Sequence, residues 1–285
     1  MNISSRIQQL FGLSVLAAGL VISTAIPAAA QTVPPVPGEF LGADLITEDA
    51  ATATAFYSEL FGWGVEKIKD GEYALTHKGR LVASVSTIEK DADVSRTFWL
   101  VGLAVNDLEA SVRAATKKGA KVFENIRTVP DYGRLAVIGD PEKAPIMLIE
   151  PGAKRIGGTT GPGAWAWVEF WTDDPKGAAG FYGDVIGYET KTIDRNGKPY
   201  GLFTGSGKNL AGLVKIPDEF ENVNPSWAPY VGVSDIQQSM ARVKDLGGRV
   251  VLGVEESSGA LISLILDPVG GAIFLYEIGT YDGER

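Results

Sequence analysis

Hydrophobic and polar residues follow the same order twice in each half of the chain. In the first half, a short apolar run near residue 43 leads into an acidic turn and then a helical pattern over residues 51–60, which stops at Gly62. A second helical pattern covers residues 108–118 and stops at Gly119. A glycine directly after the last apolar turn is typical of a helix C-terminal cap. The pattern therefore predicts two strand–helix pairs in this half.

Each predicted helix is followed by two or three β-rich runs, such as residues 73–77 and 80–87, which Lys78-Gly79 joins as a plausible hairpin turn. The second half repeats the pattern. Residues 43–65 align with 168–190, residues 99–122 align with 227–250, and Asp140-Pro141 has its counterpart in Asp267-Pro268. Internal similarity of this kind indicates a duplicated structural unit. The sequence predicts an α+β fold of four βαβββ units arranged as two domains.

The division of the chain follows from this repeat. We predict a signal peptide at residues 1–30, a linker at 31–39, a first domain at 40–151, a Gly-rich linker at 152–163, a second domain at 164–280 and a tail at 281–285. Arg6, the apolar run after it and the small residues Ala28 and Ala30 are typical of a secretory signal cleaved before Gln31. An uncleaved membrane anchor is the alternative. We expect a periplasmic or secreted protein with no stable membrane insertion after cleavage.

Three recurring motifs resemble those of the vicinal oxygen chelate superfamily, which includes glyoxalases, bleomycin-resistance proteins and extradiol dioxygenases. They are an Asp that precedes a helix bearing Phe56-Tyr57 or Phe181-Tyr182, the Gly62-Trp63 or Gly187-Tyr188 pair after it, and the late Asp-Pro turns. The resemblance implies that paired βαβββ units curl their sheets into cups with helices outside. Because members of this superfamily catalyse different reactions and some only bind, the resemblance does not specify an activity.

The resemblance also implies positions for metal ligands. Metal-dependent members use His and Glu at strand positions that correspond here to Gly42, Leu100, Trp167, Ala228, Met147 and Phe274. None of these side chains is a usual metal ligand. We therefore predict no cofactor. A divalent metal held by carboxylates drawn from Asp44, Glu169, Glu150 and Glu277 remains a less favoured alternative.

Strand alternation indicates which side chains line each cup, because successive residues point to opposite faces. In the second domain, residues 166, 168, 170 and 172 are predicted to face a helix. The cup would then receive Trp165, Trp167, Glu169, Trp171 and, from a neighbouring strand, Tyr230. In the first domain the same reasoning gives Asp44 and Ile46, with Tyr73 as a further candidate. Asp44 and Glu169 occupy the same register, although each could also be a structural acceptor for an indole or backbone N–H group.

Composition excludes several functions. The chain has no cysteine, and its single histidine, His77, is expected on the surface in a turn. A net charge of −9 with no basic cluster argues against a nucleic-acid partner. Residues 205–208, Gly-Ser-Gly-Lys, lack the spacing of a phosphate-binding loop and are predicted to form a β-turn.

Three functions remain open. The favoured one is a metal-free protein that binds a small amphiphilic or cationic molecule through Trp167, Glu169, Trp171, Tyr230, Asp44 and Ile46, because indoles offer apolar area and cation–π attraction. The second is a lyase, isomerase or dioxygenase-type enzyme with Glu169 or Asp44 as the catalytic base or with an unusual metal site. The third is a structural module with self-filled cups. The protein could be a monomer or a homodimer.

Overall fold

The structure is a computed structural model that describes residues 34–88, 97–195, 197–217, 223–257 and 260–279. The predicted signal peptide lies outside these residues. Within them, no helix is long and apolar enough to cross a membrane.

The first half contains two strand–helix–three-strand units. Their elements are β1 (Phe40–Thr47), α2 (Ala50–Phe61), β2 (Gly64–Lys69), β3 (Glu72–His77), β4 (Arg80–Thr87), β5 (Phe98–Ala104), α3 (Leu108–Lys117), β6 (Lys121–Val129), β7 (Gly133–Gly139) and β8 (Pro145–Pro151). The second half repeats this order. Its elements are β9 (Trp165–Thr172), α4 (Pro175–Ile186), β10 (Glu189–Arg195), β11 (Lys198–Gly205), β12 (Lys208–Lys215), β13 (Ser226–Val233), α5 (Ile236–Asp245), β14 (Arg249–Ser257), β15 (Ala260–Leu266) and β16 (Ala272–Glu277). The predicted α+β fold of βαβββ units is confirmed.

Local sequence explains where the helices begin and end. Each helix starts after an aspartate, at positions 49, 107, 174 and 235, whose carboxylate accepts a backbone N–H group from the first turn. Gly62 and Gly187 end α2 and α4 with φ angles of 68° and 91°, in the left-handed region that glycine tolerates. The predicted hairpin at Lys78-Gly79 and the β-turn at residues 205–208 are also confirmed, because strands end and begin on either side of them.

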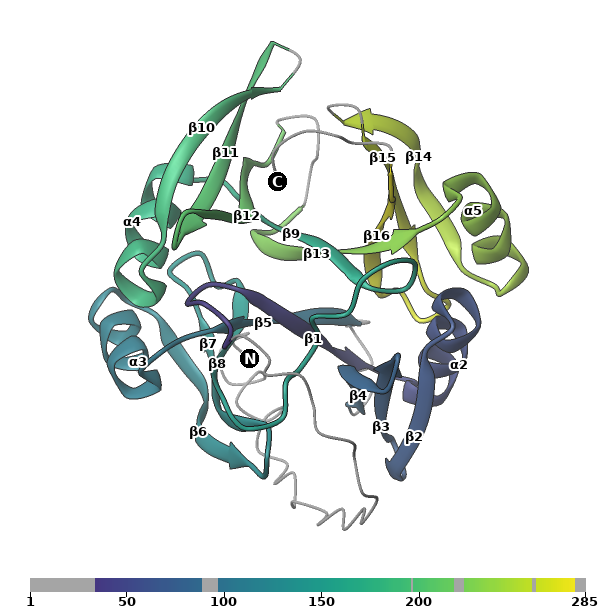
Figure 1. The fold of residues 1–285 in the computed structure, drawn as a ribbon, viewed down its shortest axis with the longest axis horizontal. Coiled ribbons are helices and arrows are strands. Elements are labelled where there is room, and N and C mark those ends of the chain that lie inside the picture. The colour runs from purple at the N-terminus through teal and green to yellow at the C-terminus, as the bar shows by residue number, and fades with distance from the viewer. Residues whose placement is uncertain (1–33, 89–96, 196, 218–222, 258–259, 280–285) are drawn as a thin grey trace, which may run out of the picture.

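The strands form two eight-stranded sheets, and each sheet takes its strands from one half of the chain. The order is β2-β3-β4-β1-β5-β8-β7-β6 in the first and β10-β11-β12-β9-β13-β16-β15-β14 in the second. The inner strands β1 and β5, like β9 and β13, are antiparallel, and each pairs on its other side with the parallel last strand of its own unit. Each sheet curls so that its outer strands rise on both sides of the central pair (Figure 1). Each cup is thus made within one half of the chain.

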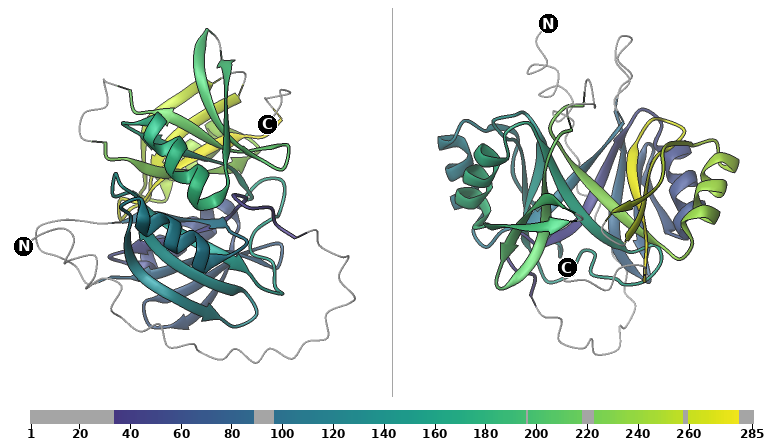
Figure 2. Two further views of the ribbon diagram at one scale, coloured as in Figure 1. Left: turned by 90° about the vertical axis from the view of Figure 1, so that its left-hand side faces the viewer. Right: turned by 90° about the horizontal axis from the view of Figure 1, so that it is seen from above.

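The two sheets lie back to back, and their cups open in opposite directions (Figures 1 and 2). One continuous hydrophobic core fills the space between them, with Leu45 and Val101 from the first sheet and Phe170 and Val231 from the second. Helix α3 packs beside α4 and helix α2 beside α5, so the helices close this core at its two sides.

Buried hydrogen bonds cross between the two halves. The Tyr182 hydroxyl, on α4, donates to Asp140 Oδ2 in the first half at 2.8 Å and accepts the indole N–H of Trp227 at 2.9 Å. Its counterpart Tyr57, on α2, accepts the indole N–H of Trp99 at 3.2 Å and donates to the carbonyl oxygen of Gly271 in the second half at 3.4 Å. The Phe-Tyr and Asp-Pro motifs of the repeat therefore meet across the interface between the halves.

Candidate functional site

Strand β9 carries a polar cluster on the face that lines the second cup. Val168 and Phe170 point into the core between the sheets, whereas Trp167 and Trp171 join a separate cluster on the cup face. The prediction for Trp165 is wrong. A register shift between β9 and β13 at Tyr230 and Val231 turns Trp165 into the inter-sheet core, where its indole N–H donates to the carbonyl oxygen of Val82 at 2.9 Å.

Glu169 is the centre of this cluster and is only 7 % exposed. Its Oε2 accepts the Tyr230 hydroxyl at 2.7 Å and the Trp171 indole N–H at 3.1 Å, and its Oε1 accepts the Tyr200 hydroxyl at 2.5 Å. The buried carboxylate is thus held by three neutral donors, as a buried charge requires. The alternative considered from sequence, an acceptor for an indole N–H group, is realised here.

Tyr200 completes the cluster and was missed by sequence reasoning. It lies on β11, and its hydroxyl also accepts the indole N–H of Trp167 at 3.1 Å, while the guanidinium carbon of Arg195 lies 3.4 Å from the centre of its ring. Burial, followed by the charge of Glu169, holds the pKa values of Tyr200 and Tyr230 well above their ordinary range. Both hydroxyls therefore remain proton donors at neutral pH.

Gly212 explains how Tyr200 reaches the carboxylate. It lies opposite Glu169 in the β9–β12 pairing, and a Cβ atom there would lie 2.2 Å from the Tyr200 hydroxyl oxygen and 2.7 Å from Glu169 Cγ. A glycine in the middle of a strand often marks such a close approach. This signal was available in the sequence.

Aromatic rings cover the rest of the cluster. Tyr230 stacks on Phe274 with ring centres 4.4 Å apart, and Trp171 lies 5.9 Å from the same ring. The cup face continues with apolar residues of β15 and β16, including Ile262 and Leu264. Trp167, Trp171 and Tyr200 are only partly buried, so these three side chains supply the accessible part of the hydrogen-bonded cluster.

The first cup is different. Ile46 lies, as predicted, on the cup face, but there it packs in an apolar cluster with Leu100, Val137, Met147 and others. Asp44 accepts the backbone N–H of Ser84 at 3.0 Å, and burial raises its pKa in opposition to that hydrogen bond. Asp44 therefore acts as an acceptor for a backbone group.

Tyr73, the further candidate for the first cup, lies on the opposite face. Its ring packs against the core between the sheets, so this prediction is wrong. An aromatic ring in a half-buried strand fits either face, and only the strand pairing decides between them.

The residues at the superfamily's ligand positions do not fit a metal. Met147 pairs with Gly102, and Phe274 pairs with Tyr230. By the same register, the corresponding positions in the first unit of each domain are Ser84 and Gly212. These eight positions supply no imidazole and no carboxylate. Across the described residues, no group of three or more His, Cys, Asp or Glu side chains could hold a metal ion.

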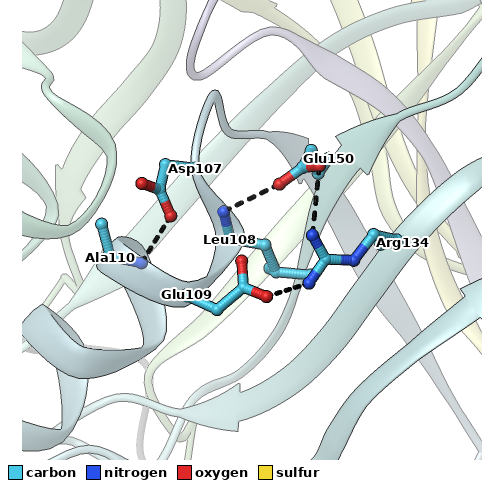
Figure 3. Close-up of polar contacts among 6 residues, drawn as sticks. All are labelled: Asp107, Leu108, Glu109, Ala110, Arg134 and Glu150. Carbon is cyan, nitrogen blue, oxygen red and sulfur yellow. Dashed lines mark hydrogen bonds and ion pairs between the residues drawn. The ribbon is translucent and has the colours of Figure 1, made fainter.

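Two carboxylates of the alternative metal set have other partners. Glu150 accepts the backbone N–H of Leu108 at the start of α3 at 3.1 Å and pairs with Arg134, which also binds Glu109 (Figure 3). Glu277 accepts the backbone N–H of Ile236 at the start of α5 at 2.8 Å. A carboxylate beside a helix N-terminus is favourable, so these residues stabilise helix starts outside the cups.

A cavity of about 390 Å³ lies beside Glu150, at the edge of the first cup. Its walls come from the segment after β8, the start of the described chain and the junction between β5 and α3. Two charged side chains in its wall are paired, Arg155 with Glu39 and Lys154 with Asp131.

His77 is buried, contrary to the surface position expected from sequence. It is 7 % exposed, and its Nδ1 lies 2.8 Å from the Thr159 hydroxyl in the linker between the halves. Lys78 donates to the carbonyl oxygen of Thr160 at 2.7 Å. The β3–β4 turn thus binds the linker, a contact that local sequence cannot reveal.

Family comparison agrees with this architecture. Residues 40–148 match the model of the Glyoxalase/Bleomycin resistance protein/Dioxygenase superfamily. The first domain matches this superfamily, and the second domain repeats its fold. Solved structures with the same fold include the Mn(II)-bound glyoxalase from Novosphingobium aromaticivorans, with a TM-score of 0.61 and 15% identity over 85% of this chain and 82% of that chain. Another is 2,2',3-trihydroxybiphenyl 1,2-dioxygenase from Sphingomonas wittichii strain RW1, with a TM-score of 0.62 and 14% identity over 86% of this chain and 92% of that chain.

Similar proteins extend over both halves of the chain. The anthracycline biosynthesis protein DauV of Streptomyces sp. (strain C5) is 28% identical over 259 residues, which cover 85% of this chain and 94% of that protein. The putative glyoxylase CFP32 of Mycobacterium tuberculosis (strain CDC 1551 / Oshkosh) is 28% identical over 240 residues, covering 81% of this chain and 91% of that protein.

Proposed function

We propose that this protein binds a small amphiphilic molecule on the aromatic cup face of its second domain without a metal of the superfamily type. The observation that carries the proposal is the buried Glu169 carboxylate, held by Trp171, Tyr200 and Tyr230 beneath partly exposed indole rings. Flat aromatic surfaces with a few fixed polar groups are characteristic of small-molecule sites. The similarity to a protein named for anthracycline biosynthesis favours a ligand with a planar aromatic body.

The second domain is the better candidate because its cup combines partly exposed indole rings with a carboxylate, whereas the residues at the base of the first cup are apolar and buried. Leu100, Met147 and Ile149 are 3 %, 5 % and 3 % exposed and pack against Ile46 at the base of that cup. Of the predicted contacts, we assign Trp167, Glu169, Trp171 and Tyr230 to the site and leave Asp44 and Ile46 as structural residues of the first domain.

Calorimetric titration with doxorubicin, an anthracycline, and with 2-naphthylmethylamine tests the proposal. We expect saturable binding that Trp171→Ala weakens by about tenfold, equivalent to about 1.4 kcal/mol. The control Phe98→Ala removes an aromatic ring that packs against the apolar cluster of the first cup and should change affinity by less than about twofold. Absence of binding by both probes and by 2-naphthoate at about 1 mM, or equal losses in the two variants, contradicts the proposal.

An enzyme is the second candidate, with Glu169 or Asp44 as general base. The observation in its favour is that each cup contains a shielded carboxyl group: Glu169 is buried, and burial raises the pKa of Asp44. Glu169→Gln separates the two functions: an enzyme loses turnover and retains much of its binding, whereas a binding protein for a cation loses affinity. Lyase or isomerase chemistry on a small oxygenated substrate would be the activity to assay.

We also propose export. The arginine and apolar run of residues 1–30, followed by Ala28 and Ala30, support secretion with cleavage before Gln31. N-terminal sequencing of the protein recovered from a periplasmic fraction tests this, and an intact Met1 in the cytoplasmic fraction contradicts it. Because each cup is completed within one half of the chain, we expect a monomer to be sufficient for binding.

A further inference from the structure

The direction of each hydrogen bond around Glu169 restricts what a ligand can offer to this site. An indole N–H only donates, and the two tyrosine hydroxyls keep their protons. Trp171, Tyr200 and Tyr230 donate to the carboxylate, and Trp167 donates to the Tyr200 oxygen. All four side-chain protons are therefore used inside the cluster.

These residues can still accept hydrogen bonds from a ligand, and they attract positive charge. The Glu169 carboxylate has further lone pairs, and the Tyr230 oxygen, which donates its one proton, keeps lone pairs as well. The indole rings of Trp167 and Trp171 add negatively polarised faces, and the carboxylate near their N–H edges strengthens the attraction for a cation. A ligand carboxylate would instead meet like charge and receive no proton from these four donors.

Arg195 shows that the cluster already attracts a cation. Its guanidinium carbon lies 3.4 Å from the centre of the Tyr200 ring, on the ring that is hydrogen-bonded to Glu169. Its position on β10 places it at the wall of the cup, on a different strand from the carboxylate. Arg195 is thus an internal positive charge that competes with a cationic ligand and partly offsets the charge of Glu169.

We infer that the second cup selects molecules that combine a flat aromatic body with a protonated amine, and that Arg195 limits their affinity. This inference rests on the proposed binding function. It adds the charge and hydrogen-bonding class of the ligand, which the aromatic lining alone leaves open.

Three naphthalene probes with one body and different charge test it: 2-naphthylmethylamine, 2-naphthalenemethanol and 2-naphthoate, titrated calorimetrically at pH 7 into the whole protein. We expect the amine to bind at least about tenfold more tightly than the carboxylate, with the alcohol between them. Glu169→Gln should reduce the advantage of the amine over the alcohol to less than about twofold, because the buried charge is lost. Arg195→Gln should increase the affinity for 2-naphthylmethylamine, because it removes the competing positive charge.

Controls keep the outcomes distinct. Asp245→Asn removes an equal charge from an exposed position at the end of α5, on the outer side of the sheet, and should leave all three affinities unchanged. If Glu169→Gln does not fold, as judged by its circular dichroism melt, Tyr230→Phe provides the test, since it removes a hydroxyl oxygen and keeps the ring.

The two proposals fail differently. Equal affinities for amine and carboxylate leave the binding function standing and refute the selection for amines. If 2-naphthoate binds more tightly than the amine and Arg195→Gln abolishes this binding, the site takes aromatic acids. That result also refutes the selection for amines. Absence of binding by all three probes and by doxorubicin refutes both.

Discussion

Replacing Tyr182 with Phe should destabilise the protein strongly, although it removes a single oxygen atom. The hydroxyl donates to Asp140 and accepts from Trp227, and the three side chains are 0 %, 5 % and 4 % exposed. A hydrogen bond to a charged group contributes about 1.5–3 kcal/mol, and a buried donor left without a partner costs about 1–3 kcal/mol. Because Asp140 also accepts the backbone N–H of Ala144, we expect a total loss of about 3–4 kcal/mol.

Tyr57→Phe is the matched comparison from the other half. Its hydroxyl donates to the Gly271 carbonyl at the longer distance of 3.4 Å, with the Asp267 carboxyl also close to it, so the expected loss is about 1–2 kcal/mol. Tyr132→Phe, at the wall of the cavity, should cost less than about 0.5 kcal/mol. Urea unfolding followed by tryptophan fluorescence and by circular dichroism gives the three free energies. A loss for Tyr182→Phe that is below about 1 kcal/mol, or no larger than that for Tyr57→Phe, would refute the reasoning.

Three further predictions concern pH and packing. Burial raises the pKa of Asp140 to about 6, above its unfolded value, so the free energy of unfolding should fall by about 2 kcal/mol as pH rises from 4 to 6. Asp140→Asn should flatten this slope in urea titrations at several pH values. Burial lowers the pKa of His77, so its contribution to the free energy of unfolding should be complete above the ordinary pKa of histidine and should decrease as pH falls. If the loss of stability at acid pH is the same in a His77→Gln variant, this prediction is contradicted. Gly212→Ala should abolish binding of 2-naphthylmethylamine by displacing Tyr200 and Glu169, whereas Gly253→Ala, whose Cβ would meet no atom within 4 Å, should bind normally.

The fold was predictable because its determinants are local or repeated. Apolar periodicity, aspartates before the helices and Gly62 after α2 lie within short windows, and the internal repeat supplied each element four times. Alternation along β9 also placed Trp167 and Glu169 on the cup face. It failed at Trp165 because a register shift changes which face a side chain occupies, and nothing within the strand itself signals that shift.

The candidate site was only half predictable because its hydrogen bonds join different strands. Tyr200 lies 31 residues from Glu169 along the chain, and its role follows only from the β9–β12 and β11–β12 pairing. The burial of His77 likewise depends on Thr159, 82 residues away. Gly212 is the exception, because a glycine inside an apolar strand does indicate a close approach before its partner is known.

The exchanged contacts of Tyr57 and Tyr182 give the molecule the character of a two-fold dimer joined into one chain. Equivalent helices of the two halves each carry a tyrosine to the far side, and the core between the sheets belongs to both. In an isologous interface the same surface serves both partners. Residues 40–151 expressed alone would leave this surface uncovered, and we expect them to pair with a second copy in which Tyr57 of each meets the turn at Asp140 of the other. The linker between the halves is then not needed to form the interface. Its effect is that each first half pairs with the second half of its own chain.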